Sequence, residues 1–204
     1  TVGLRVVSRR FTRFGMALLD FDNDGRLDLY EANGRVGLQG EAFAADPYAE
    51  PNLLLRGIDG PAFTEVAPRG GTATPIVRTS RAAAFGDIDN DGGIDILVAN
   101  RDETPTLLRN VVWLKYAIMP VALKDGRGSD ALGARLTIHA GGRAMRRDVR
   151  TAYSYLAAND PRVHVGLGAA TRVDRIDVRW PDGTTEHFGP FDADRIVTLR
   201  RGQG

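Results

Sequence analysis

Residues Gly15–Tyr30 read Gly-Met-Ala-Leu-Leu-Asp-Phe-Asp-Asn-Asp-Gly-Arg-Leu-Asp-Leu-Tyr, and residues Ala82–Leu97 read Ala-Ala-Ala-Phe-Gly-Asp-Ile-Asp-Asn-Asp-Gly-Gly-Ile-Asp-Ile-Leu. Each stretch places an aspartate-rich loop between two short apolar segments, and the two copies are 67 residues apart. Short apolar segments bounded by Gly and Asp are typical of buried strands rather than helices. The first half of the chain is therefore predicted to be all-β and to contain two copies of one unit.

The repeated unit is longer than the loop alone. Asn52–Arg56 reads Asn-Leu-Leu-Leu-Arg after the first copy, and Thr106–Asn110 reads Thr-Leu-Leu-Arg-Asn after the second. Gly37–Pro51, which is rich in Ala, Gly and Pro, predicts an irregular insertion between the copies. Gly57–Gly60 predicts a turn before a short strand at Phe63–Val66.

The acidic positions of the two loops are suited to a cation. The candidate ligands are Asp20, Asp22, Asp24, Asp28 and the backbone carbonyl of Arg26 in the first loop, and Asp87, Asp89, Asp91, Asp95 and the backbone carbonyl of Gly93 in the second. Calcium takes about 6–8 oxygen ligands, and alternate carboxylates of a tight loop can converge on one point. Gly25 and Gly92 allow the bend, because glycine tolerates positive φ. We therefore expect two Ca²⁺ sites.

Two other interpretations of these loops stay open. Asp, Asn and Gly also form polar turns that bind no metal, and magnesium is a second ion that prefers oxygen ligands. Calcium is favoured because four carboxylates crowded together repel each other without a cation, and every acidic position is filled in both copies. The expected role of the ions is structural rather than catalytic.

Composition limits the class of protein. The chain has 204 residues, 43 % of them hydrophobic, as expected for a globular protein of one or two domains. A formal net charge of +1 gives no reason to expect a nucleic-acid partner. The absence of cysteine excludes disulfides and thiolate metal sites. No apolar run approaches the ~20 residues of a transmembrane helix. No signal peptide is visible, so we expect a processed N-terminus or further residues before Thr1.

The second half, from Trp113, shows the alternation of half-buried antiparallel strands. Apolar and polar residues alternate in Ala134–Ala140 and in Arg175–Trp180. Gly141 and Gly142 predict a hairpin turn, Pro181–Gly183 predicts a second turn, and the final strand is expected at about Arg195–Arg200. These segments predict a small antiparallel β-sandwich or barrel.

Both halves resemble known families. The loops, with Phe-Gly before Asp87, resemble FG-GAP/VCBS repeats, which form the blades of integrin-type β-propellers. The second half resembles the ASPIC/UnbV domain, and the stretches that carry the likeness are Ala131–Arg135, Gly141–Arg143, Arg162–Gly168 and Val173–Gly183. The resemblance implies two FG-GAP/VCBS repeats at 1–110, an ASPIC/UnbV-like β domain at 111–204, bound calcium, and export to the periplasm or the cell exterior. It implies no established enzymatic activity.

Two repeats are too few for a closed propeller, which needs about 4–8 blades. Either further blades lie upstream, or the array of blades is partial and open. An open array exposes strand edges, which soluble proteins normally cover. We therefore expect a protein partner, or another part of this chain, to cover that edge.

The remaining polar residues form no catalytic pattern. The three histidines, at 139, 164 and 187, lack metal-binding spacing and are expected at the surface or facing a barrel interior. No serine lies in a nucleophile elbow. Arginines at 143, 146, 147 and 150 surround one strand, with Tyr153 and Tyr155 nearby; a solvated face is favoured over an anion or sugar contact.

The sequence thus favours a non-enzymatic, calcium-stabilised interaction or structural module, acting as a peripheral subunit of a periplasmic or cell-surface assembly. The alternative is a carbohydrate-binding or accessory domain of an extracellular polysaccharide-acting enzyme, because loops of propellers often carry such sites. An enzyme with an unrecognised site would need convergent titratable groups outside the loops, and the sequence offers none.

Overall fold

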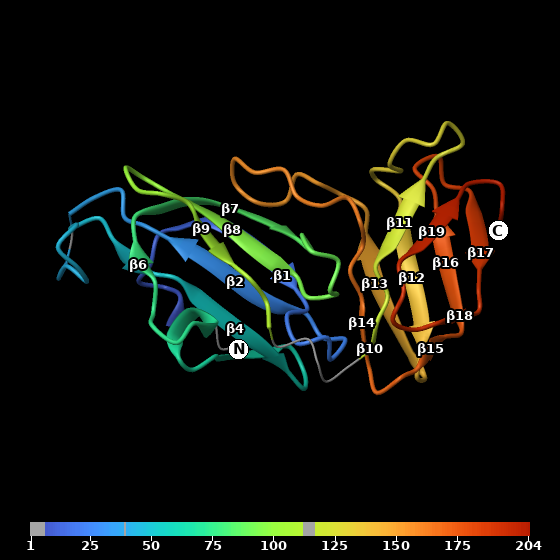
Figure 1. The fold of residues 1–204 in the computed structure, drawn as a ribbon, viewed down its shortest axis with the longest axis horizontal. Helices are drawn as coiled ribbons and strands as arrows, with labels where there is room; N and C mark the ends of the chain where they lie inside the picture. The colour runs from blue at the N-terminus through green and yellow to red at the C-terminus, as the bar shows by residue number, and fades with distance from the viewer. Residues whose placement is uncertain (1–6, 39, 112–116) are drawn as a thin grey trace.

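The computed structural model describes residues 7–38, 40–111 and 117–204, and within these ranges the fold is all-β apart from one 3₁₀ turn, η1 (Arg69–Gly71). The described residues contain no helix with the length and apolarity to cross a membrane. The all-β prediction is therefore confirmed. Figure 1 shows two groups of sheets side by side, the first from blue to green and the second from yellow to red.

A four-stranded antiparallel sheet forms the first unit. Its order is β1-β2-β4-β5, with bounds β1 (Arg13–Leu19), β2 (Asp28–Asn33), β4 (Leu53–Ile58) and β5 (Ala62–Glu65). Within the predicted insertion, the described residues 37–38 and 40–51 are irregular except for a bridge from Ala49 to Gly34 and for β3 (Glu50–Pro51), which pairs with β6 (Val77–Arg78).

The second unit is a three-stranded antiparallel sheet. Its order is β7-β8-β9, with bounds β7 (Ser80–Gly86), β8 (Asp95–Asn100) and β9 (Thr106–Leu108). Strand β7 packs closely against β1, because a Cβ on Gly15 would lie 2.3 Å from the backbone nitrogen of Ala83. Between the two units lies a shared core that includes Leu19, Tyr30 and Phe85.

The C-terminal part is built on a second four-stranded antiparallel sheet. Its order is β13-β12-β16-β17, with bounds β12 (Arg135–Ala140), β13 (Arg143–Asp148), β16 (Arg175–Arg179) and β17 (Thr185–Phe188). Three pairs of short strands complete it: β10 (Ala117–Ile118) with β14 (Gly166–Gly168), β11 (Val121–Lys124) with β19 (Val197–Arg200), and β15 (Arg172–Val173) with β18 (Phe191–Asp192).

The C-terminal part has a core of its own, to which alternate residues of these strands contribute. Leu136, Ile138, Ile176 and Val178 are fully buried and lie on one face of the sheet, as the period of two predicts. Trp180 is also buried in this core, one residue beyond the end of β16. The two parts of the chain therefore have separate cores.

The structure confirms one detail of the C-terminal prediction and corrects two others, the strand direction and the barrel alternative. The hairpin at Gly141 and Gly142 is confirmed, since both residues have positive φ and Ala140 pairs with Arg143. However, β11 and β19 pair in parallel, so the sheets are not purely antiparallel. The described strands form several sheets rather than a closed barrel. The predicted start of this part, Trp113, lies outside the described residues.

Candidate metal centre

The two aspartate-rich loops occupy the same place in their respective sheets. Each loop connects the first two strands of its unit, with Leu19 paired to Asp28 across the first and Gly86 paired to Asp95 across the second. The first loop takes positive φ at Asn23 and Gly25, and the second takes it at Asn90 and Gly92. The sequence repeat is therefore a repeat of backbone conformation as well, with Asn and Gly at the positions that need left-handed φ.

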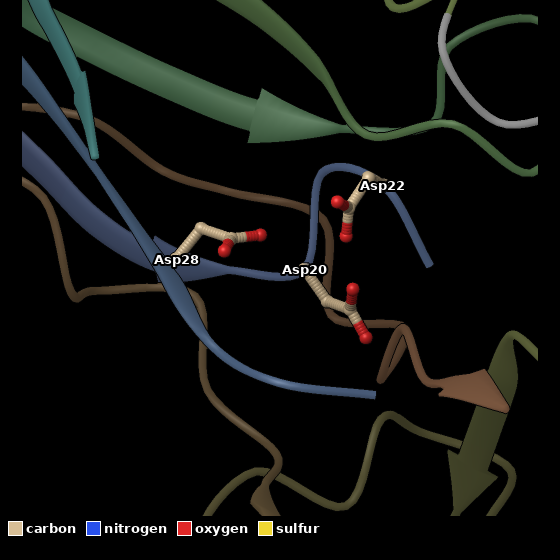
Figure 2. Close-up of side chains that lie close together, drawn as sticks. All are labelled: Asp20, Asp22 and Asp28. Atoms are coloured by element: carbon tan, nitrogen blue, oxygen red, sulfur yellow. The ribbon is translucent and has the colours of Figure 1, made fainter. Parts of the chain in front are cut away.

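In the first loop, three carboxylates meet. Asp20, Asp22 and Asp28 each offer an oxygen within 4.8 Å of the others, and their exposed fractions are 2 %, 6 % and 0 %. Figure 2 shows these side chains around the bend of the loop. Oδ1 of Asp20 and Oδ1 of Asp22 are buried and have no hydrogen-bond partner among the described residues. Buried carboxylate oxygens without donors cost free energy, which either a proton or a bound cation compensates.

The second loop has the same arrangement of three carboxylates, but one of them is exposed to solvent. Asp87, Asp89 and Asp95 also bring carboxylate oxygens within 4.8 Å of one another, but Asp89 is exposed to solvent. Oδ2 of Asp87 accepts the backbone N–H of Gly92 at 3.1 Å, as Oδ2 of Asp20 accepts that of Gly25 at 2.9 Å. The two groups of carboxylates are thus equivalent in position and differ in burial.

The closing aspartate of each loop is held by two backbone amides. Asp28 accepts the N–H groups of Phe21 at 2.9 Å and Gly57 at 2.7 Å. Asp95 accepts the N–H groups of Ile88 at 3.0 Å and of Asn110 at 2.8 Å. These bonds fix the carboxylates and join the loop to the echoed segment that follows each copy. The echoed segment of each repeat therefore supplies, or directly precedes, a backbone N–H group that holds the closing aspartate of the loop.

Sequence reasoning missed one arginine at each loop. A nitrogen of Arg56 lies 2.5 Å from a carboxylate oxygen of Asp22, and a nitrogen of Arg109 lies 2.5 Å from one of Asp89. The same guanidinium groups also approach the carboxylates of residues 24 and 91, at 3.5 and 3.4 Å. The repeated Leu-Leu-Arg sequence could have indicated both residues, because Arg56 and Arg109 each follow two leucines.

Burial makes the first loop electrostatically costly when it is charged. Burial raises the pKa of Asp20 to about 7, with the nearby charges of Asp24 and Asp22 adding to this effect and Arg147 opposing it. Burial likewise raises the pKa of Asp28 to about 7 and raises the pKa values of Asp22 and Asp87. A bound cation would reverse this penalty, because an opposite charge favours the ionised carboxylates.

The donor set fits a hard cation. Only oxygen atoms converge in either group, which suits calcium or magnesium and not the softer metals. Asp24 and Asp91 lie outside the groups of three; their Oδ1 atoms accept the backbone N–H of Arg26 at 2.8 Å and of Gly93 at 2.9 Å. Ligation by the carbonyls of Arg26 and Gly93 stays a prediction.

The C-terminal part of the chain contacts both loops directly. The backbone N–H of Gly168 donates to the carbonyl of Asn23 at 3.0 Å, and Nη1 of Arg143 donates to that of Asp24 at 2.9 Å. At the second loop, Nη2 of Arg162 donates to the carbonyl of Asp87 at 2.7 Å. In Figure 2 the brown ribbon of the C-terminal part runs beside the first loop.

The histidines divide into two kinds. His139 and His187 both contact the carboxylate of Asp177, at 2.8 and 2.7 Å, on the four-stranded C-terminal sheet, where surface histidines were expected. His164 is half-buried and lies against the second loop rather than on an open surface. Its Nε2 lies 2.9 Å from the carbonyl of Gly92, and burial lowers its pKa to about 4. His164 therefore belongs to the contact between the C-terminal part and the second loop.

Comparison with known proteins identifies the C-terminal part. No curated protein matches the chain. Residues 124–204 match the family model described as ASPIC and UnbV, which confirms the resemblance for this part: the chain carries an ASPIC/UnbV domain at its C-terminal end.

Proposed function

We propose that this chain is a non-enzymatic, calcium-stabilised interaction module of an exported protein assembly. In this proposal the first half consists of two FG-GAP/VCBS-type repeats, each with one Ca²⁺ in its loop. The observation that carries the proposal is the pair of buried oxygens without partners, Oδ1 of Asp20 and Oδ1 of Asp22, inside a group of three carboxylates. The same group recurs at the same place of the second unit.

The ions would stabilise the contacts between the two parts of the chain. Backbone carbonyls of both loops accept hydrogen bonds from the ASPIC/UnbV domain, so the conformation of each loop sets the position of its acceptors. A ligand that binds only the native loop stabilises every contact which depends on that loop. Calcium would therefore favour docking of the domain as well as the fold of the repeats.

The proposal is tested by counting bound calcium. Isothermal titration of metal-stripped protein is expected to give two Ca²⁺ per chain. Asp22→Asn and Asp89→Asn should each remove one site, and the double variant should remove both. Glu41→Gln, which changes an exposed carboxylate outside the loops, is the matched control and should retain two sites. A chain that binds no calcium, or whose binding ignores both loop substitutions, would contradict the proposal.

A protein partner is supported by the second sheet. Strand β9 pairs with β8 on one side, and within the described residues no strand pairs with its other side. Leu107 of β9 and its cross-strand neighbour Leu97 are 54 % and 48 % exposed. An unpaired edge beside exposed leucines is a surface that soluble proteins normally cover. The exposed pair thus supports a peripheral subunit that binds a neighbour through β9.

The partner is tested by capture from cell-envelope extract. The wild-type chain should retain a protein that a Leu97→Arg/Leu107→Arg variant loses, while calcium binding by the variant stays unchanged. Retention of the same proteins by both chains would contradict this role for the β9 surface.

A further inference from the structure

A cavity of about 140 Å³ lies between the first metal loop and the ASPIC/UnbV domain. One wall contains Leu18 and Asp20 of the first unit, and the other contains Arg147, Tyr153 and His164 of the domain. A single water molecule needs only about 10–15 Å³ by a comparable measure. The cavity therefore has room for a small organic molecule.

Arg147, on β13, presents an unused donor to this region. Its Nη1 donates to the carbonyl of Arg146 at 3.0 Å, whereas its Nη2 is buried and has no hydrogen-bond partner in the part of the chain that the structure describes. Asp20 borders the same cavity and its charge interacts with that of Arg147, but its Oδ2 accepts the N–H of Gly25 and it accepts no hydrogen bond from Nη2 of Arg147. A buried guanidinium donor without a partner costs free energy, so a ligand atom that accepts a hydrogen bond is expected there.

A second arginine of the cavity, Arg150, has no carboxylate partner among the described residues. Arg162 is neutralised by Asp160, with nitrogen and oxygen 2.5 Å apart. Arg150 instead lies over the ring of Tyr153, at 5.1 Å from its centroid, and forms no ion pair with any described residue. Arg150 thus has no carboxylate partner, and Arg147 keeps a free N–H beside the charge of Asp20. Both guanidinium groups can donate to an anion, and their planar forks match the geometry of a carboxylate.

His164 adds an acceptor to the two donors. Its Nε2 lies 2.9 Å from the carbonyl of Gly92, and since a carbonyl only accepts, Nε2 carries the hydrogen. In the neutral ring Nδ1 is then an acceptor, and this atom is buried with no hydrogen-bond partner from residues 7–38, 40–111 or 117–204. A hydroxyl group of a ligand could donate to it. Leu18, Leu27 and the ring of Tyr153 provide an apolar wall beside these polar groups.

We propose that this cavity binds a small hydroxylated carboxylate of the uronic-acid class. The carboxylate interacts with Arg147 and Arg150, a hydroxyl donates to Nδ1 of His164, and the C–H face of the sugar ring packs on Leu18 and Leu27. This site goes beyond the proposed metal-dependent function, because none of these contacts involves a metal ion.

The test is a calorimetric titration of the full chain with D-glucuronate, in calcium buffer and in buffer freed of metals over a chelating resin. Glucose, which lacks the carboxylate, and acetate, which lacks the hydroxyls, are the matched probes. Saturable glucuronate binding is expected, with at least about tenfold weaker binding of either probe. Arg150→Gln and Arg147→Gln should each weaken glucuronate by about tenfold or more, whereas Arg135→Gln on the neighbouring strand β12 should leave it unchanged.

Arg150 is exposed, so its substitution tests the site even if Arg147→Gln fails to fold. If glucuronate affinity depends on Arg150 in either buffer, the site is supported. This result does not depend on whether the loops bind calcium. Absence of glucuronate binding in both buffers overturns the inference. Equal affinity in the Arg150→Gln and Arg135→Gln chains, or acetate binding as tightly as glucuronate, overturns it as well.

Discussion

Gly166 of the ASPIC/UnbV domain lies against Asp20 of the first loop so closely that a Cβ on the glycine would be 2.4 Å from Oδ2 of the aspartate. The same Cβ would be 2.5 Å from Cα of Asn23. Only a residue without a side chain can occupy this position while the loop keeps its conformation. The domain and the first candidate metal site are therefore fitted to each other at the level of the backbone.

Gly166→Ala should damage both the fold and the first metal site. The added methyl group must displace Asp20 or separate the two parts, at a cost of about 1–3 kcal/mol in the free energy of unfolding. Calcium affinity should fall at one site and persist at the other, as measured by titration. Gly126→Ala is the control, because a Cβ there meets no atom within 4 Å. Equal stability and affinity in the two variants would refute this close fit.

Metal-free protein should lose stability as the pH rises from about 4 to about 7. The folded pKa values of Asp20 and Asp28, about 7, lie above the ordinary aspartate pKa of about 3.9. The native state then binds more protons than the unfolded state within this window, so the free energy of unfolding decreases with increasing pH. Urea unfolding across this range in metal-free buffer measures the effect. A steady rise in stability would show that the two carboxyls are not destabilised by burial.

Calcium should reduce or invert that pH dependence, because the ion binds the ionised carboxylates and competes with their protons. The stabilisation by calcium should therefore be larger at pH 7.5 than at pH 5. The same urea series with a fixed calcium concentration tests this. Equal stabilisation at both pH values would argue against ligation by these aspartates.

Arg56→Gln should lower the stability of the metal-free chain and raise its affinity for calcium. Arg56 lies beside Asp22 and partly neutralises the loop, so its removal should lower metal-free stability. Removal of a positive charge next to a divalent cation should also tighten calcium binding, by roughly three- to tenfold. Arg109→Gln is the equivalent change in the second loop, where exposure to solvent should make the effect smaller. Weaker calcium binding in the Arg56 variant would contradict this.

Calcium should also protect the junction between the repeats and the ASPIC/UnbV domain. The backbone N–H of Gly168 donates to the carbonyl of Asn23, which lies inside the first loop. Hydrogen exchange at this amide should slow when calcium is added, because opening of the junction then also requires release of the ion. The amide of Val178, on β16 within the core of the domain, serves as the reference. Equal change at both amides would indicate general stabilisation without coupling at the junction.

The local parts of the structure could be predicted from the sequence. The strands around Asp20 and Asp87 follow from short apolar segments bounded by Gly and Asp, and the hairpin at Gly141 follows from its Gly-Gly pair. The carboxylates that converge, such as Asp22 and Asp28, were among the predicted ligands. Each of these features depends on residues close together in the chain, where spacing alone limits the geometry.

The contacts between the two parts could not be predicted in this way. Arg143 and Asp24 are 119 residues apart, and His164 and Gly92 are 72 apart, so their meeting depends on how two separate cores are docked. The parallel pairing of β11 with β19 likewise depends on where the chain returns to the sheet. Periodicity reports which face of a strand is buried, and carries no information about the partner that buries it.

The measurement that tests the central claim most directly is a thermal melt of metal-stripped protein, without metal, with calcium, and with magnesium. A hundredfold excess of calcium over its dissociation constant should add about 2.7 kcal/mol per site to the free energy of unfolding. The melting temperature should therefore rise clearly with calcium, rise less with magnesium, and stay unchanged in the Asp22→Asn/Asp89→Asn double variant. An unchanged melting temperature of the wild-type chain in every metal would contradict the claim that these loops are cation sites.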